Sequence, residues 1–448
     1  MRPALLLLIV LTMLPGAASA RLLFRTLPVV AESGLRDGDA EAPKVAWTTR
    51  VRAPGAAVVR VVVGAADLGR GSWISFRSLA DGAEHRLDAS SLDDWGRTSA
   101  MLNGEEVEVS LHVAPGDKHV FVRLTGVSGS ERPTIESQCG PNDDRVASTD
   151  NRVGRINPPG CTVWRIGNGA FLTAGHCADV DPDLGGPQLP NGVLDWTNAT
   201  VVEFNVPASN ASGNTVVAAP QDQYPIVLNS VQWTFQGNGF PLGNDWCVFR
   251  VSENSNTHLL PHQAYGLPFR ITRELPATNA NLRVTGFGTD TGTANQTNQT
   301  ATGPFNGETS GTGTVRLDHS VDTEGGNSGS PIIWEANQFA IGIHTNAGCD
   351  DDSAGTNAGT SFELDALENA INAAPGAGTI YVDSGHTLVI EQQGTLVRPI
   401  WTIGGGISTV TTGGRISVYP GAYSIPAGTV LSKVMTIEAP VGTVTIAP

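Results

Sequence analysis

The alternation of hydrophobic and polar residues predicts a small all-β module at the N-terminal side of the chain, over residues 21–135. The stretch 72–79, SWISFRSL, alternates as a half-buried strand does. The stretches 56–66, 106–113 and 119–127 are rich in valine, and glycine turns separate them. A polar linker follows. We interpret this region as a β-sandwich-like module that is a pro-region, an inhibitor or a substrate-binding unit.

One segment in the last quarter of the chain has a helical rather than a strand-like pattern. In TSFELDALENAINAA, Leu364, Leu367 and Ile371 fall on one helical face. Thr360 and Glu363 have the spacing of a capping box, in which each side chain bonds the other residue's backbone amide. The pattern predicts a helix that closes the segment 139–374.

Residues 378–448 form a third segment, in which short apolar strands are spaced by glycine turns. The spacing suggests stacked coils, as in a β-solenoid, or a small β-sandwich. A handful of such coils buries little apolar surface alone, so we expect this module to pack on the rest of the protein. A chain of 448 residues is long enough for these three units.

Residues 1–20 predict a secretory signal peptide. An arginine precedes an apolar run, and Ala18-Ser19-Ala20 provides a cleavage site, so we expect cleavage after Ala20 and a secreted or periplasmic protein. The alternative, a membrane anchor, is disfavoured because the run is short and no second hydrophobic segment follows. The net charge of −16 argues against a nucleic-acid or anionic-membrane partner.

The cysteine count is odd, which in an exported protein implies at least one disulfide and one cysteine left over. Cys161 and Cys177 enclose a loop for which cross-linking contributes about 3 kcal/mol in the chain-entropy estimate. The pairing among Cys139, Cys247 and Cys349 is open, with Cys139 and Cys349 as one candidate pair. The chain has no C-x-x-C pair and its histidines are scattered, so we expect neither a metal site nor a cofactor.

Three separate stretches supply what acyl transfer by a serine requires, namely a nucleophile, a base and a carboxylate that orients the base. The base candidate is His176, which ends a strand-like run in FLTAGHC. The carboxylate candidate is Asp245, which directly precedes an apolar strand. Asp195 is the rival, but it lies so close after His176 that little chain remains for the intervening strands.

The nucleophile candidate is Ser328, in DTEGGNSGSP. Flanking glycines permit a tight turn whose amides point inward, so the amides of Gly326 and Ser328 are the predicted oxyanion hole. A linker turn is the competing interpretation. It fits poorly because Pro331 and an apolar run follow at once.

The motifs TAGHC, NDWCVF and GNSGSP occur in the order His, Asp, Ser, and VTGFG stands at 284–288. Over roughly residues 139–374 the chain therefore resembles the chymotrypsin-like (trypsin-like) serine proteases, in particular the bacterial glutamyl-endopeptidase branch. The resemblance implies an all-β fold of two antiparallel Greek-key barrels, a triad in the cleft between them, and a C-terminal helix.

The chain departs from this family at two positions. Asn327 stands where animal digestive members carry an aspartate that pairs with a new N-terminal ammonium, so we do not expect trypsinogen-style activation. Cys247 stands where the family commonly has a small apolar residue, and we interpret it as a buried free thiol.

Two signals for substrate specificity compete. Asp322 occupies the position that selects Arg or Lys in trypsin-like enzymes. Thr323 and the downstream His344, in GIH, instead resemble the donors that hold an acidic side chain in glutamyl endopeptidases.

The residues and the resemblance together predict a secreted serine endopeptidase that acts on proteins or peptides, with a preference for acidic residues before the scissile bond. Trypsin-like cleavage after Arg or Lys is the alternative specificity. A non-catalytic binding or adhesion protein on a protease scaffold is the alternative function, although such proteins usually lack a member of the triad.

Overall fold

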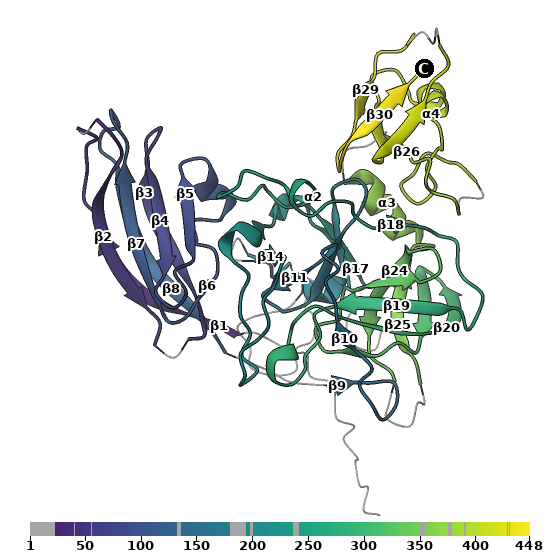
Figure 1. Ribbon diagram of the computed structural model, residues 1–448, viewed down its shortest axis with the longest axis horizontal. Coiled ribbons are helices and arrows are strands. Elements are labelled where there is room, and N and C mark those ends of the chain that lie inside the picture. Colours follow the sequence, from purple (N-terminus) through teal and green to yellow (C-terminus); the bar gives the residue numbers. More distant parts are fainter. Residues whose placement is uncertain are drawn as a thin grey trace, which may run out of the picture.

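The computed structural model describes residues 23–39, 41–54, 56–131, 136–179, 194–197, 200–235, 242–349, 355–374, 379–388, 391–427, 429 and 431–448. The predicted signal peptide, residues 1–20, lies outside the described residues. Figure 1 shows two N-terminal sheets, a central region of two curled sheets and a C-terminal module beyond helix α3. The predicted all-β, chymotrypsin-like fold is confirmed.

The N-terminal module consists of two four-stranded sheets, with strand orders β1-β8-β3-β6 and β2-β7-β4-β5. Alternate residues of β7 are buried, as the sequence pattern predicts for a strand with one face in the core. Its elements are β1 (Leu23–Glu32), β2 (Lys44–Arg52), β3 (Val58–Asp67), β4 (Trp73–Ser78), β5 (Glu84–Asp88), α1 (Ser91–Asp94), β6 (Leu102–Asn103), β7 (Glu106–Val113) and β8 (Phe121–Glu131).

The first central sheet has seven strands in the order β15-β14-β11-β12-β13-β17-β16 and curls into a half-barrel. The short 3₁₀ turn η1 leaves it at the end of β13. Its elements are β11 (Val153–Asn157), β12 (Thr162–Arg165), β13 (Phe171–Thr173), η1 (Gly175–Cys177), β14 (Val201–Glu203), η2 (Pro220–Asp222), β15 (Gln223–Pro225), η3 (Leu228–Ser230), β16 (Gln232–Thr234) and β17 (Trp246–Phe249).

The second central sheet closes into a six-stranded barrel because β20 pairs with both β19 and β21. Strands β10 and β18 join it from outside, and β9 pairs with β22 beside it. The elements are β9 (Glu136–Ser137), β10 (Val146–Ala147), α2 (Pro261–Ala264), β18 (Arg270–Ile271), β19 (Asn281–Gly286), η4 (Gly292–Ala294), β20 (Gln299–Gly311), β21 (Thr314–His319), β22 (Thr323–Glu324), β23 (Pro331–Trp334), β24 (Phe339–Asn346) and β25 (Asn357–Ser361).

The predicted helix is present as α3 (Asp365–Ala373), and Leu367 and Ile371 are buried on its inner face. The predicted capping box is wrong. Thr360 lies on β25, paired with Ile343 of β24 and Arg316 of β21, and Leu364 occupies the N-cap without a side-chain cap. Barrel pairing therefore outweighs the local capping pattern.

The C-terminal module is built from parallel strands, which decides for stacked coils rather than a sandwich. Ile380, Ile416 and Ile437 stack across β26, β27 and β29. The elements are β26 (Thr379–Val382), α4 (Ile403–Thr409), β27 (Arg415–Val418), β28 (Gly421–Ser424), β29 (Thr436–Glu438) and β30 (Val444–Ala447).

Both flanking modules pack on the central region. Asp383 of the C-terminal module accepts hydrogen bonds from Arg270, the shorter at 2.7 Å, and Tyr381 joins the hydrophobic cluster that contains Trp164 and Ile371. On the other side, Gln223 of the first sheet exchanges two hydrogen bonds with the backbone of Met101. No described helix is long and apolar enough to cross a membrane.

Candidate active site

His176 lies in η1, at the point where the buried strand β13 leaves the first sheet. Gly175 precedes it, and a Cβ there would stand 2.0 Å from the carbonyl oxygen of Thr234, so only glycine fits. Cys177 follows and is joined to Cys161 by a disulfide. The histidine is therefore held from both sides of a very short turn.

Asp245 lies directly before β17, and its side chain is the hydrogen-bond partner of His176. Its Oδ2 is 2.6 Å from His176 Nδ1, and its Oδ1 accepts the backbone amide of His176 at 2.9 Å. The two bonds fix both the ring and the backbone of the histidine. Asp195, the alternative carboxylate, lies beside Ala178, the residue after Cys177. Its backbone amide donates a hydrogen bond to the carbonyl of Ala178.

Thr360 is a residue of this site that sequence reasoning assigned to a different role. Its hydroxyl accepts a hydrogen bond from the amide of Asp245 at 3.1 Å and donates one to the Asp245 carbonyl at 3.0 Å. A strand of the second barrel thus fixes the backbone of a residue in the first. The separation of 115 residues explains why no local pattern pointed to this contact.

Electrostatics favour the protonated form of His176. Burial lowers the pKa of His176, but the charge and hydrogen bond of Asp245 raise it by more, so the pKa lies above the ordinary value of 6.5. A base at this site has to be neutral to accept a proton.

If His176 is the base, kcat/KM is expected to rise as the pH is raised through the pKa of His176, with the midpoint above pH 6.5. The sign follows from the raised pKa, because His176 is cationic and inactive below it. A pH–rate profile of peptide hydrolysis checks this. A flat profile between about pH 5 and 8 would exclude a histidine base.

Ser328 lies in the turn between β22 and β23, and the first sheet holds this turn in place. The Ser328 carbonyl accepts the amide of Thr162 at 2.9 Å, and the Gly329 carbonyl accepts Nε1 of Trp164 at 3.0 Å. Gly329 has φ +90°, and a Cβ there would stand 2.2 Å from Thr173 Oγ1. Both central sheets therefore meet at the serine.

The structure brings the Ser328 turn against the His176 turn, with 3.9 Å between the Ser328 carbonyl oxygen and Cys177 Sγ. Ser328 is half-buried. Among the described residues, no hydrogen bond joins the Ser328 hydroxyl to His176. The hydrogen bond between His176 and Asp245 is present, and the one between Ser328 and His176 is not. Catalytic hydrogen bonds are commonly long before substrate is bound.

The predicted oxyanion site consists of the amides of Gly326 and Ser328, which donate no hydrogen bond to any described residue. Asn327 between them shapes the turn, since its Oδ1 accepts the backbone amide of Glu324 at 2.9 Å and its backbone amide donates to the Glu324 carbonyl. The turn is thus held by a neutral side chain.

Arg145 is a second residue that the sequence did not reveal. Its side chain is buried, with bonds to the Asp143 carboxylate, to Gln299 Oε1 and to the Thr289 carbonyl. A Cβ on Gly288 would stand 2.3 Å from both Arg145 and Asn327, so these two side chains both lie against that glycine. An internal cation therefore lies close to the asparagine of the nucleophile turn.

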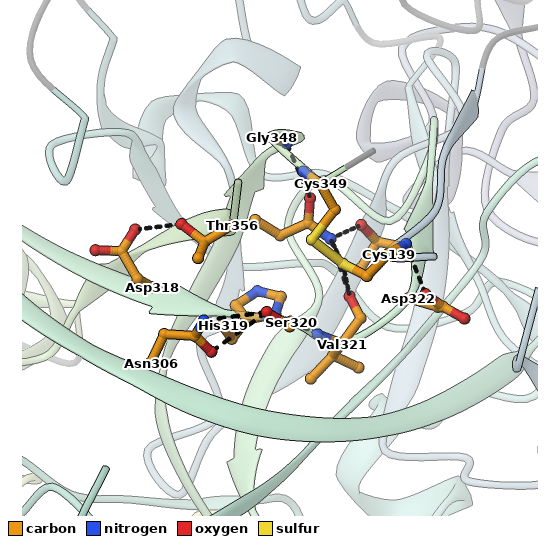
Figure 2. The surroundings of a disulfide bond; sticks show 12 residues. Cys139, Asn306, Asp318, His319, Ser320, Val321, Asp322, Gly348, Cys349 and Thr356 are labelled. Atoms are coloured by element: carbon orange, nitrogen blue, oxygen red, sulfur yellow. Dashed lines mark hydrogen bonds between the residues drawn. A yellow bond between two sulfur atoms is a disulfide. The ribbon is translucent and has the colours of Figure 1, made fainter. Parts of the chain in front are cut away.

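The three candidate pocket residues have different surroundings. His344 and Thr323 are buried, and His344 Nδ1 is 3.2 Å from Nε2 of His319. Asp322 is also buried, but both of its carboxylate oxygens accept backbone amides, from Cys139 at 2.8 Å and from Asp144 at 2.7 Å. Figure 2 shows the first of these bonds beside the Cys139–Cys349 disulfide.

The disulfide answers the cysteine question that the sequence left open. Cys139 pairs with Cys349 across a separation of 210 residues, and Cys247 is a buried free cysteine. Burial raises the pKa of the Cys247 thiol, so it stays protonated at neutral pH.

The Trypsin family model matches residues 146–362. This part of the chain is a trypsin-family domain. Its matched range contains both turns described above, with His176 and Ser328, and the strand that begins after Asp245. The flanking modules lie outside the match. Among curated proteins, no sequence matches the chain.

Solved structures similar to the trypsin-family domain include proteases and a heparin-binding protein. A Glu endopeptidase in complex with MPD is 19% identical, with TM-score 0.37, and the match covers 53% of this chain and 99% of that one. A mutant of human heparin binding protein is 15% identical, with TM-score 0.36 and coverage of 55% and 99%. The protease Anisep from Arthrobacter nicotinovorans is 13% identical, with TM-score 0.36 and coverage of 52% and 99%.

Proposed function

We propose that the protein is an exported serine endopeptidase whose triad is His176, Asp245 and Ser328. The observation that carries the proposal is the pairing of the His176 ring with the buried Asp245 carboxylate, against the turn that bears Ser328. Membership of the trypsin family supports the same chemistry. The leader-like residues 1–20 and two disulfides support export to an oxidising compartment.

In the proposed reaction, Ser328 Oγ attacks the peptide carbonyl carbon while its proton passes to His176 Nε2. Asp245 holds the Nδ1–H of His176 and stabilises the cation that forms. The amides of Gly326 and Ser328 donate to the oxyanion. His176 then protonates the leaving amine, and water repeats the sequence on the acyl-enzyme to release the acid.

For specificity, we infer an acidic residue before the scissile bond, and the hydrogen bonds around His344 carry this inference. The amide of Val321 donates to Nδ1 of His319 at 3.2 Å, so a neutral His319 carries its proton on Nε2. That proton faces Nδ1 of His344, which leaves the proton of His344 on Nε2. The tautomers are assigned from this chain of bonds.

Both histidines are neutral at neutral pH, so they act as dipolar donors rather than as cations. Burial lowers the pKa of His319 to about 3. Burial also holds the pKa of His344 well below its ordinary value, and the charges of His319 and His176 lower it further. A neutral donor held in this way suits a carboxylate ligand. Asp322 is a poor partner for Arg or Lys because backbone amides already occupy both of its oxygens.

Peptides that differ only in the residue before the scissile bond test the proposal. A substrate with Glu is expected to exceed its Gln counterpart in kcat/KM by roughly 10- to 100-fold, since a hydrogen bond to a charged group contributes about 1.5–3 kcal/mol. Arg and Lys substrates are expected to be poorer still. A preference for Arg would transfer the pocket from His344 to Asp322, and turnover of none of these peptides would favour a binding protein.

A further inference from the structure

The segment 136–145, here called the strap, joins the N-terminal module to the trypsin-family domain and lies along the pocket residues. Its strand β9 pairs with β22, which places Ser137 opposite Thr323 and Glu136 opposite Glu324. Cys139 is bonded to Cys349, which follows β24. The strap is therefore part of the wall around Thr323 rather than a loose connection. Figure 2 shows Cys139 of the strap beside Cys349 and Asp322.

Asn357, on β25, is the residue at which these elements meet, and it is fully buried. Its Nδ2 donates to Thr323 Oγ1 at 3.0 Å and to the Val321 carbonyl at 2.9 Å, and it lies 3.3 Å from Cys139 Sγ. Its Oδ1 accepts the amides of Gly348 at 2.9 Å and Cys349 at 3.2 Å. One amide side chain thus connects the strap, the pocket threonine and the segment after β24.

These bonds decide what the Thr323 hydroxyl can do. Because Asn357 Nδ2 can only donate, Thr323 Oγ1 accepts that bond and keeps its own hydrogen for another partner. Among the described residues no acceptor takes this hydrogen, although Thr323 is fully buried. A buried hydroxyl without an acceptor is costly, and a substrate carboxylate would satisfy it.

The strap also holds in place a charge that would otherwise oppose such a substrate. Asp322 is adjacent to Thr323, and a free carboxylate there would repel an acidic side chain. The amides of Cys139 and Asp144 hold both of its oxygens toward the strap. Asp322 occupies the position that selects Arg or Lys in trypsin-like enzymes. Because its oxygens are bonded to the strap, an aspartate at this position is compatible with an acidic substrate.

We propose that Asn357 is the positioning residue that sets the primary pocket for a carboxylate, and that the disulfide-bonded strap holds the pocket in this form. The inference rests on the proposed function, because it assigns a further determinant to the same site. It adds that acidic specificity depends on residues that precede the family domain as well as on His344.

The test replaces Asn357 with aspartate, which keeps the shape and the acceptor for Gly348 and Cys349 but turns the donor toward Thr323 into an acceptor. The Thr323 hydroxyl then donates to the new carboxylate, and a negative charge enters the wall. In Asn357→Asp, the ratio of kcat/KM for Glu over Gln peptides is expected to fall by about tenfold or more, mainly through KM for the Glu peptide. Asn306→Asp makes the same change at an exposed position of β20 and is expected to keep the wild-type ratio.

Three outcomes separate this inference from the proposed function. Wild-type protein that gains no fluorophosphonate adduct on Ser328, or lacks Glu preference, contradicts the proposed function before any variant is made. Labelled Asn357→Asp protein with the wild-type ratio overturns the role of Asn357. If Asn357→Asp does not unfold cooperatively, Thr323→Val replaces it, and an unchanged ratio in that variant likewise overturns the inference.

The strap is tested separately with the double variant Cys139→Ser, Cys349→Ser, which leaves the Cys161–Cys177 disulfide intact. Release of the strap is expected to lower the Glu-over-Gln ratio and to raise turnover of Arg peptides, as Asp322 becomes accessible. A double variant with wild-type ratios for Glu, Gln and Arg would show that the strap plays no part in specificity.

Discussion

Replacement of Ser328 by alanine is expected to lower kcat by about 10⁶-fold, with KM and the thermal unfolding temperature close to those of the wild type. The loss is large because the hydroxyl is the atom that forms the acyl-enzyme, and the remaining groups of the triad then have nothing to activate. Stability is retained because the bonds that hold this turn, to Thr162 and Trp164, involve backbone carbonyls.

The measurement is the initial rate with a Glu peptide, with enough enzyme to detect single-turnover hydrolysis. Ser310→Ala is the matched control, because Ser310 is an exposed serine on β20 and its loss should leave kcat unchanged. Activity in Ser328→Ala within tenfold of the control would mean that another group is the nucleophile.

Replacement of Asp245 by asparagine is expected to lower kcat by about 10⁴-fold. Asp245 accepts hydrogen bonds from both the ring and the backbone of His176, and an amide in its place can present its NH₂ group to the ring. The imidazole then holds its proton on the wrong nitrogen and cannot accept one from Ser328. The backbone clamp by Thr360 is unaffected, so the variant is expected to fold.

Asp195→Asn is the informative control for this experiment, since Asp195 is the other aspartate that the sequence offers as an orienting carboxylate. It is expected to keep kcat within about tenfold of the wild type. A large loss in Asp195→Asn together with an active Asp245→Asn would reverse the assignment of the carboxylate.

The sequence is most informative where the signal is local. The helix α3 follows from the spacing of Leu367 and Ile371, which depends only on helical periodicity. The strands of the N-terminal module follow from alternation, and the candidate triad follows from three short motifs in a particular order. Each periodic pattern or motif lies within a short stretch of sequence, so neighbouring residues are enough to recognise it.

Contacts between distant segments could not be predicted in this way. Asn357 reaches the strap across 218 residues, and Asp322 reaches Cys139 across 183. Thr360 carries a local capping pattern, yet barrel pairing places it on a strand where its hydroxyl bonds Asp245. Side chains such as these support the site rather than react in it, and their roles depend on the closed barrel.

The proposed triad requires that His176 and Asp245 activate Ser328, and covalent labelling measures that activation. Folded wild-type protein is treated with a fluorophosphonate, and the modified peptide is located by mass spectrometry. We expect one adduct, on Ser328, which disappears in Ser328→Ala and forms much more slowly in Asp245→Asn. Folded protein that gains no adduct at Ser328, or gains it equally fast in Asp245→Asn, would contradict the proposed triad.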